Sequence, residues 1–371
     1  MGDGSKNFWK DRLYNKNVRK RFLYIYVPIA LALFLILNVA GFLSVNSDRR
    51  LLDATQSFKE NVPVVYSDKY NISFWGLEEL HPFDTKKYMR IHDALKAQHP
   101  AAVEKFITAY KPSAELIQLA HGADYFASLR SSWVLARITE LGFLRFFPDR
   151  LARNLILEPM LYHMGGSLLA GLAAIEHGWA INLGGGFHHA SYDDGGGFCA
   201  LADIGLTVKY LRREKKITKA MIIDLDAHQG NGHARDFIDD KDVYIVDFYN
   251  ADVYPRDEDA KRGIDLGFEM RAFSGDKIFF DALEKALPEA FKAFDPDIVI
   301  YIAGTDGLEG DPLGAMSISE DGIIKRDEMV FRAARDRNKP IVMLLGGGYQ
   351  KSNARVIARS ILNLRQKFGL F

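Results

Sequence analysis

The chain has 371 residues, 48 basic side chains balanced by 48 acidic ones, and 48% hydrophobic residues. This length suits one large domain or two ordinary ones, and the hydrophobic content excludes disorder over most of the chain. The formal net charge of zero provides no field to attract nucleic acid, so we expect no nucleic-acid partner. The single cysteine, Cys199, excludes an intramolecular disulfide and a zinc site built from several thiolates.

Residues 22–47 form an apolar run without charge, preceded by a basic segment at residues 1–21. A membrane-spanning helix needs about 20 apolar residues, so the run predicts a single-pass signal anchor. Lys and Arg are more frequent before the run than after it, which predicts a cytoplasmic N-terminus with the rest of the chain across the membrane. The alternatives are a signal peptide cleaved near Ala40 or Gly41, and a buried core helix.

A polar linker at 48–61 is expected to lead into one folded domain at 62–371. Short runs rich in Val, Ile and Leu predict strands at 62–66, 179–183, 220–225, 243–248, 297–303 and 340–345. Longer patterns predict helices at 86–98, 101–110, 113–120, 151–177, 198–213, 279–294, 320–338 and 351–366. This alternation indicates an α/β fold with a mostly parallel central sheet between helical layers.

Five of the predicted strands are followed by residues that can do chemistry. The segments are GGGFHH (184–189), DAHQGN (226–231), YNADVYP (249–255), GTDGLEGD (304–311) and GGGYQ (346–350). In an open parallel sheet, ligands bind at the carboxyl ends of the strands. The sequence therefore predicts a single site at one edge of the sheet.

Asp226 and His228 form a candidate metal-binding pair at this edge, with Asp306 as a third ligand. At a strand end, residues i and i+2 point to the same side, so both side chains can reach one ion. Two carboxylates and one imidazole with open positions suit a catalytic Zn²⁺ or Fe²⁺. The competing interpretation is that the two aspartates cap helices and the histidine is an ordinary loop residue.

His188 and His189 follow three consecutive glycines and are candidates for general acid and base catalysis beside the metal. Asp224 and Asn231 flank the metal motif and are the expected hydrogen-bond partners of the two rings. Tyr349 follows another glycine triplet, and its phenol could donate a hydrogen bond to a developing oxyanion. A buried aromatic residue on a glycine turn is the alternative for Tyr349.

Several ordered motifs resemble the zinc-dependent histone deacetylase family. They are GGGFHH, DGGGFC, IIDLDAHQGNG, AGTDGLEGDPLG and GGGYQ, and with VVYSDKYNISFWGLEELHPFDTKKY they look closest to the class IV, histone deacetylase 11-like branch. The resemblance runs from about Val62 to the C-terminus. It implies an arginase/deacetylase-type three-layer fold with about eight parallel strands. It also implies hydrolysis of acyl-lysine amides by a water activated by zinc.

The resemblance also assigns roles to individual positions. Zinc ligands match Asp226, His228 and Asp306; the general base and acid matches His189; the electrostatic histidine matches His188, paired with Asp224; and the carbonyl-polarising tyrosine matches Tyr349. The walls of an acyl-lysine tunnel match Gly197, Phe198 and Tyr254. An inner monovalent-cation site, usually K⁺, matches Asp224, Asp226, His228, Asp247 and Phe248. Asn231 is usual for class IV, where other classes have aspartate, and class IV members favour long fatty-acyl groups.

Three other functions compete with a lysine deacylase. A ureohydrolase of the arginase type needs a second metal-binding aspartate where this chain has Gly230, so a binuclear site is not expected. A deacetylase of polyamines or other small amides fits the same motifs. A non-catalytic, membrane-tethered binding module is opposed by the presence of all the expected ligands, both histidines and the tyrosine.

Overall fold

The computed structural model describes Thr55, residues 58–72 and residues 84–371. The predicted basic segment, the predicted anchor at 22–47 and most of the predicted linker lie outside these residues. Within the described ranges, no helix combines the length and apolar character needed to cross a membrane. The described residues belong to one unit, Asp48–Phe371.

Eight parallel strands form one sheet in the order β2-β1-β3-β8-β7-β4-β5-β6, which confirms the predicted α/β fold with a parallel central sheet. The strands are β1 (Val62–Tyr66), β2 (Phe106–Thr108), β3 (Trp179–Asn182), β4 (Ala220–Asp224), β5 (Val243–Asn250), β6 (Leu266–Met270), β7 (Ile298–Ile302) and β8 (Ile341–Leu344). Strands β3, β4, β7 and β8 are buried along their whole length. Helices on both faces explain why these strands are continuous apolar runs.

The two strands at the edges of the sheet were not predicted. The predicted helix at 101–110 is wrong, because α6 (Pro100–Val103) ends early and the chain then extends as β2. Strand β6 alternates between more and less exposed residues and contains Gly267 and Glu269, so it lacks an apolar run. Edge strands are short and half-exposed, and pairing with a neighbour decides their structure more than composition does.

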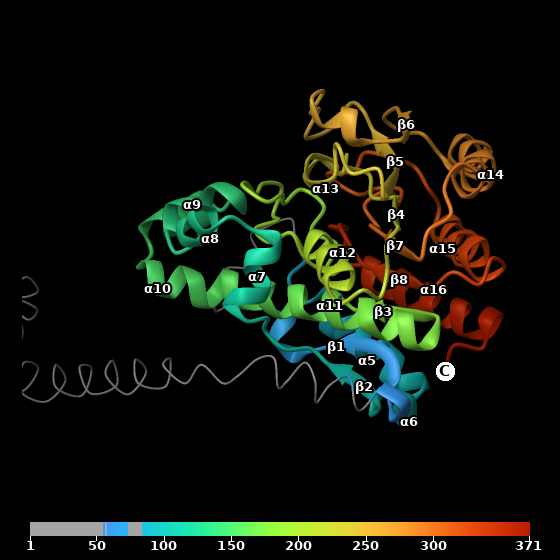
Figure 1. Ribbon diagram of the computed structural model, residues 1–371, viewed down its shortest axis with the longest axis horizontal. Helices are drawn as coiled ribbons and strands as arrows, with labels where there is room; N and C mark the ends of the chain where they lie inside the picture. The colour runs from blue at the N-terminus through green and yellow to red at the C-terminus, as the bar shows by residue number, and fades with distance from the viewer. Residues whose placement is uncertain (1–54, 56–57, 73–83) are drawn as a thin grey trace, which may run out of the picture. The chain divides into compact units, whose positions relative to one another are not determined.

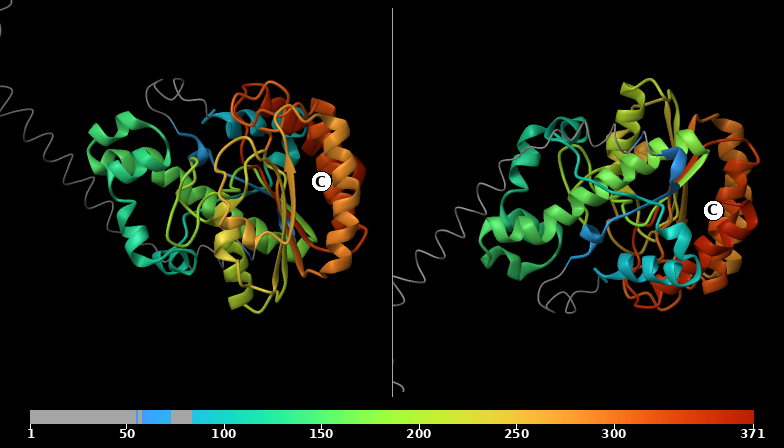
Figure 2. Two further views of the ribbon diagram at one scale, coloured as in Figure 1. Left: turned by 90° about the horizontal axis from the view of Figure 1, so that it is seen from above. Right: turned by 90° about the horizontal axis from the view of Figure 1, so that it is seen from below.

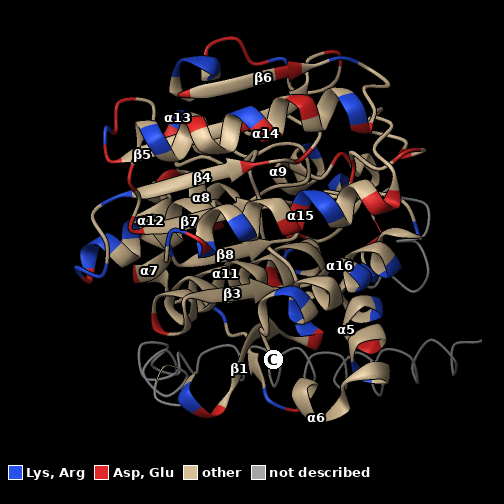
Figure 3. Ribbon diagram, turned by 90° about the vertical axis from the view of Figure 1, so that its right-hand side faces the viewer, with Lys and Arg blue, Asp and Glu red and all other residues tan. Residues whose placement is uncertain are grey.

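Helices cover both faces of the sheet (Figures 1 and 3). One layer contains α5 (Lys87–Gln98), α14 (Asp276–Ala293), α15 (Glu320–Arg335) and α16 (Asn353–Phe368). The other contains α11 (Glu158–His177) and α12 (Asp203–Arg213), with α7 (Ala114–Ala120) packed on α12 and α13 (Asn231–Asp236) nearby. The core lies between the sheet and these two layers.

Local sequence explains the bounds of the longest helices. Ser319 caps α15 by accepting a hydrogen bond from the Gly322 N–H, and two acidic residues occupy its first turn. Gly178 ends α11 in the left-handed conformation, at φ +78°. Within α11, a Cβ on Gly166 would lie 1.9 Å from the Tyr70 hydroxyl oxygen, so only glycine permits this close packing.

A group of short helices extends away from the sheet (Figures 1 and 2). It comprises α8 (Ala123–Ser128), α9 (Ser132–Ile138), the 3₁₀ helix η5 (Gly142–Phe146) and α10 (Asp149–Ala152). A π-helical turn, η6 (Arg153–Leu157), joins this group to α11. The sequence predicts no element between 121 and 150, because these helices are too short to show a clear period.

The strand register brings distant loops together at the carboxyl edge of the sheet. Asp224 at the end of β4 pairs with Ile302 at the end of β7, so the segments that follow both strands begin side by side. Asn182 of β3 likewise pairs with Leu344 of β8. The two glycine-rich loops and the two metal-motif loops therefore meet at one place.

Candidate active site

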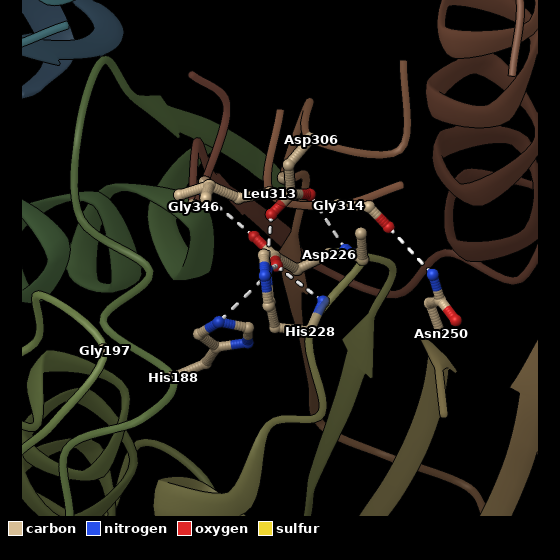
Figure 4. Close-up of polar contacts among 12 residues, drawn as sticks. His188, Gly197, Asp226, His228, Asn250, Asp306, Leu313, Gly314 and Gly346 are labelled. Atoms are coloured by element: carbon tan, nitrogen blue, oxygen red, sulfur yellow. Dashed lines mark hydrogen bonds and ion pairs between the residues drawn. The ribbon is translucent and has the colours of Figure 1, made fainter. Parts of the chain in front are cut away.

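Asp226, His228 and Asp306 form the buried centre of the site (Figure 4). Each offers one ligand atom, and these atoms lie within 4.8 Å of one another. The Nδ1 atom of His228 lies 2.8 Å from Oδ2 of Asp306 and 3.2 Å from Oδ1 of Asp226. The histidine nitrogen and both carboxylates thus face a common point.

Main-chain groups hold the two carboxylates in place. Asp226 Oδ2 accepts a hydrogen bond from the Gly347 N–H at 2.7 Å, and Asp306 Oδ1 accepts one from the Ala227 N–H at 2.8 Å. A Cβ on Gly347 would lie 2.5 Å from Asp306 Oδ2 and 2.7 Å from Asp226 Oδ2. Glycine at 347 therefore lets the backbone approach both carboxylates.

The electrostatics of this centre suit a divalent cation. Burial and the neighbouring Asp226 raise the pKa of Asp306 to about 7. Burying two adjacent carboxylates away from water costs free energy unless a positive charge lies between them. A donor set of two carboxylates and one imidazole nitrogen fits Zn²⁺ with open positions for water and substrate.

His188 lies beside the centre and is held by Asp224. Its Nδ1 is 2.8 Å from Asp224 Oδ2, and its Nε2 is 3.5 Å from Asp226 Oδ1. Although burial opposes the charged form, Asp226 and Asp224 raise the pKa of His188 to about 9. His233 also contacts Asp224 Oδ2, with its Nε2 at 2.8 Å, so one carboxylate oxygen serves two rings. The structure thus confirms the expected contact between His188 and Asp224.

His189 has a different partner and the opposite pKa shift. Its Nδ1 lies 2.8 Å from Asn231 Oδ1, while Asn231 Nδ2 donates to Asp257 Oδ2 at 3.1 Å. Because that carboxylate can only accept, the amide oxygen faces the ring, and Nδ1 carries the proton. Burial first, then His188 and His228, lower the pKa of His189 well below its ordinary value of 6.5. His189 is therefore neutral, with Nε2 as its free basic nitrogen.

Tyr349 lies beside His228 and Phe198. Its ring makes edge contacts with His228, at 6.1 Å between centroids, and with Phe198, at 5.9 Å. Burial, followed by nearby carboxylates, raises the pKa of the phenol well above 10, so the phenol keeps its proton. Its backbone N–H donates to Asp311 Oδ2 at 2.9 Å, which fixes the turn that carries it.

Two buried basic side chains, Lys87 and Arg326, hold the loops of the site. Lys87, on α5, is fully buried and donates to the carbonyls of Gly346 at 2.9 Å and Gly347 at 3.0 Å. Burial lowers its pKa to about 8. Arg326, on α15, is also fully buried and donates to the carbonyl of Leu225 at 3.1 Å, directly before Asp226.

Arg326 also reaches the second metal-motif loop. It donates to the Ala303 carbonyl at 3.2 Å and to the Gly304 carbonyl, and its Nε pairs with Asp327 at 3.0 Å. Asp327 accepts further hydrogen bonds from Tyr301 and Ser360. This buried ion pair fastens the ends of β4 and β7 to α15, so it keeps Asp226 and Asp306 at a fixed separation.

Asp247 lies next to the centre with an unsatisfied oxygen. Its Oδ2 accepts the Gly230 N–H at 2.9 Å, whereas its buried Oδ1 has no hydrogen-bond partner. An orphaned carboxylate oxygen beside Asp224 is what a second, inner cation would satisfy. The Phe248 ring packs against Phe268 and Phe279, so Phe248 could contribute only its main chain.

An apolar cavity lies beside the site. Gly197, Phe198 and Tyr349 lie at the reactive end. The described part of the wall is largely apolar and includes Ile72, Tyr88, Leu141, Phe143, Ile156, Met160 and Phe187. Tyr254 stacks edge-on against His189, at 4.9 Å between ring centroids, on the outer side.

The structure therefore brings the predicted catalytic side chains and the predicted zinc ligands together, whereas the ring of Phe248 packs elsewhere. Five further residues hold the loops of the site and are not predicted from the sequence, namely Lys87, His163, Asp203, Asp311 and Arg326. Asp203, for example, accepts the N–H groups of Gly186 at 2.8 Å and Phe187 at 2.9 Å, which positions the loop before the histidine pair. Asp311 lies within a recognised motif, whereas Lys87 and Arg326 lie in amphipathic helices, where a basic residue ordinarily faces solvent.

Known proteins are similar to this chain in sequence and in fold. A histone deacetylase domain matches residues 81–365. Histone deacetylase 2 of Arabidopsis thaliana is 47% identical over 306 residues, which are 82% of this chain and 79% of that protein. The acetoin utilization protein AcuC of Bacillus subtilis is 26% identical over 272 residues, or 68% of each chain. The crystal structure of the HDA15 HD domain covers 82% of this chain and 90% of its own, with a TM-score of 0.65 at 20% identity, which shows the fold.

The domain match extends from the segment before α5 to Arg365 within α16, so it includes each loop that meets at the carboxyl edge. The relatives support an amide hydrolase of the lysine deacetylase type. From the domain match, the 47% identity and the shared fold, we conclude that this chain belongs to the histone deacetylase family.

Proposed function

We propose that this protein is a zinc-dependent lysine deacylase of the class IV branch that removes long-chain fatty-acyl groups as well as acetyl groups. The observation that carries the acyl-length proposal is the apolar wall of the cavity beside the catalytic residues, which includes Ile72, Leu141, Phe143, Ile156 and Met160. An acetyl group would leave this apolar wall uncovered, whereas a long alkyl chain would bury its surface against the wall.

The chain's own residues supply the remaining steps of the reaction. A zinc ion held by Asp226, His228 and Asp306 would supply the Lewis acid that polarises the amide carbonyl and activates water. His189 Nε2 takes the proton of the attacking water, because burial keeps this ring neutral. The protonated His189 then gives that proton to the lysine nitrogen as the C–N bond breaks, which leaves a fatty acid and a free amine.

Two further groups stabilise the charge that develops. Tyr349 donates its phenolic proton as a hydrogen bond to the oxyanion, since its raised pKa keeps the phenol protonated. His188, charged and held by Asp224, offsets the negative charge near the water. Gly197, Phe198 and Tyr254 form the channel for the lysine stem, with Phe198 and Tyr349 in edge contact at its inner end.

The proposal includes a structural K⁺ held by main-chain oxygens around Asp224, Asp226 and His228, with Asp247 and Phe248. The unpaired Oδ1 of Asp247 supports it. We also propose that residues 22–47 anchor the chain in a membrane with a cytoplasmic N-terminus, on the evidence of the apolar run and the basic residues before it. The substrate would then be an acylated protein or peptide on the side of the catalytic domain.

The test is hydrolysis of matched acetyl-lysine and myristoyl-lysine peptides by the full chain in detergent, with and without a zinc chelator. We expect chelator-sensitive turnover that zinc restores, with the myristoyl peptide preferred. Preference for the acetyl peptide would reject the long-chain proposal and keep the zinc mechanism. Hydrolysis of neither peptide by zinc-loaded protein would reject the lysine deacylase and direct attention to small acyl amides.

A further inference from the structure

His163, on α11, is a buried histidine outside the reactive centre. Its Nε2 lies 3.2 Å from the Tyr70 carbonyl oxygen, and its Nδ1 accepts a hydrogen bond from the Gly185 N–H at 3.1 Å. Because a carbonyl oxygen can only accept, Nε2 carries the proton and Nδ1 offers its lone pair. Burial lowers the pKa of His163 to about 3, so the neutral ring keeps both contacts at physiological pH.

The segment that His163 holds leads directly to the catalytic histidine pair. The N–H groups of the next two residues both donate to Asp203, so the N–H groups of residues 185–187 are all bound by buried side chains. The packing is close, because a Cβ on Gly184 would lie 2.2 Å from Nδ1 of His163. Without the imidazole, the first of these N–H groups would lose its partner inside the protein, which costs more than the bond itself contributes.

The ring of the same histidine forms part of the cavity wall. It stacks on Tyr70 at 4.0 Å between centroids, and it meets Tyr88 edge-on at 4.5 Å. It also lies 5.5 Å from the ring of Phe187, which belongs to the held segment. All four rings line the apolar cavity, whereas Asp203 is not among the described residues of the wall. His163 therefore joins the cavity wall to the segment that carries the histidine pair.

Tyr70 connects the same wall to the segment by a second route. Its hydroxyl donates to Asn182 Oδ1 at 2.7 Å, at the end of β3. Asn182 Nδ2 donates to Ser167 Oγ at 3.0 Å, and Ser167 Oγ donates to Asp203 Oδ2 at 2.5 Å. All four residues are buried. A shift of the wall is therefore passed on to the held segment, because close-packed interiors transmit strain.

We propose that His163 is a positioning residue that couples filling of the cavity to the placement of the catalytic histidine pair. This inference rests on the proposed long-chain substrate. An acyl chain in the cavity packs against the His163 ring and fixes it, and the fixed ring holds the Gly185 N–H and the segment that follows. An acetyl group covers little of this wall. Binding energy from the long chain is thereby used to orient the base, which raises kcat as well as lowering KM.

The test measures kcat and KM of the zinc-loaded full chain and its variants in detergent, on matched myristoyl-lysine and acetyl-lysine peptides. His163→Leu keeps an apolar side chain in the wall and removes both hydrogen bonds. We expect its kcat to fall by ~10-fold or more on the myristoyl peptide and by less on the acetyl peptide, with little change in KM. His163→Met should show the same preferential loss, and cores accommodate methionine readily, which guards against misfolding of the leucine variant.

His163→Gln is the conservative variant that should recover most of the lost kcat. Its amide oxygen can accept from the Gly185 N–H, and its amide N–H can donate to the Tyr70 carbonyl. Leu172→Ala is the matched control, because Leu172 is buried on the same helix and is not among the described residues of the cavity wall. It should lower the melting temperature and leave kcat unchanged on both peptides.

The outcomes separate this inference from the proposed function. Equal loss of kcat on both peptides in His163→Leu and His163→Met would overturn the coupling. So would a glutamine variant that is no more active than the leucine variant, or a loss that Leu172→Ala reproduces. A parent protein that hydrolyses neither peptide would reject the proposed function and this inference with it, whereas an active parent with any of the other results rejects this inference alone.

Discussion

The polar edge of the sheet and the apolar cavity behind it are built on opposite principles. At the edge, carboxylates and rings are fixed by hydrogen bonds to the main chain or to each other, as Asp226 is by Gly347. In the cavity, apolar side chains such as Leu141 and Ile156 can contact a ligand only through van der Waals packing. When a polar network loses one side chain, its buried partners are left without hydrogen bonds. An apolar wall tolerates substitution by apolar side chains of similar size. The residues at the edge should therefore determine which reaction takes place, and those of the cavity should determine which acyl group the enzyme prefers.

Removing a metal ligand should have the largest effect on the polar edge. Asp226→Ala should lose bound zinc and reduce kcat/KM by ~10³-fold or more for every acyl length, because a bound metal contributes several kcal/mol to the transition state. Metal analysis and kinetics check this. Asp281→Ala is the control, since Asp281 makes only an exposed ion pair with Lys277. Stoichiometric zinc in Asp226→Ala would reject the ligand assignment.

Tyr349→Phe should remove one hydrogen bond that forms in the transition state. We expect kcat to fall by ~10²-fold or more with little change in KM. The ratio of myristoyl to acetyl turnover should stay as in the parent enzyme, because the edge acts on all acyl groups alike. A variant with unchanged kcat would show that the phenol has no part in the reaction.

Asn231→Asp should alter the pH profile. In the parent, burial holds the pKa of His189 below 6.5, so the base stays neutral down to acidic pH. A carboxylate at 231 would stabilise the imidazolium and raise that pKa by about 1–3 units. The acid limb of kcat/KM against pH should then move upwards. An acid limb at the same pH in both proteins would mean that another group controls it.

Filling the cavity should have the smallest effect on the chemistry and a selective one on the substrate. Leu141→Trp should lower myristoyl turnover by ~10-fold or more and leave acetyl turnover close to the parent value, since steric loss of chain contacts costs about 1–3 kcal/mol. Leu141→Met conserves volume and serves as control. Equal loss on both peptides would mean that the cavity wall and the polar edge are not separable.

The same contrast explains what the sequence could predict. Strand ends carry their chemistry in contiguous motifs, so Asp226, His228, Asp306 and the histidine pair were found from the residues that follow each strand. The edge strands β2 and β6 lack such motifs and depend on pairing. Lys87 and Arg326 were missed because each lies on a helix remote in sequence from the loop it holds. Only the folded arrangement shows that these basic side chains point inward.

The ion pair of Arg326 and Asp327 has a practical consequence, because solvent does not reach it. Dissolved ions screen charges over about 8 Å at physiological ionic strength, and they act through water. Added salt should therefore weaken exposed ion pairs such as that of Lys277 with Asp281, while the buried ion pair of Arg326 and Asp327 stays intact. A change in ionic strength should then leave the separation of Asp226 and Asp306 unchanged.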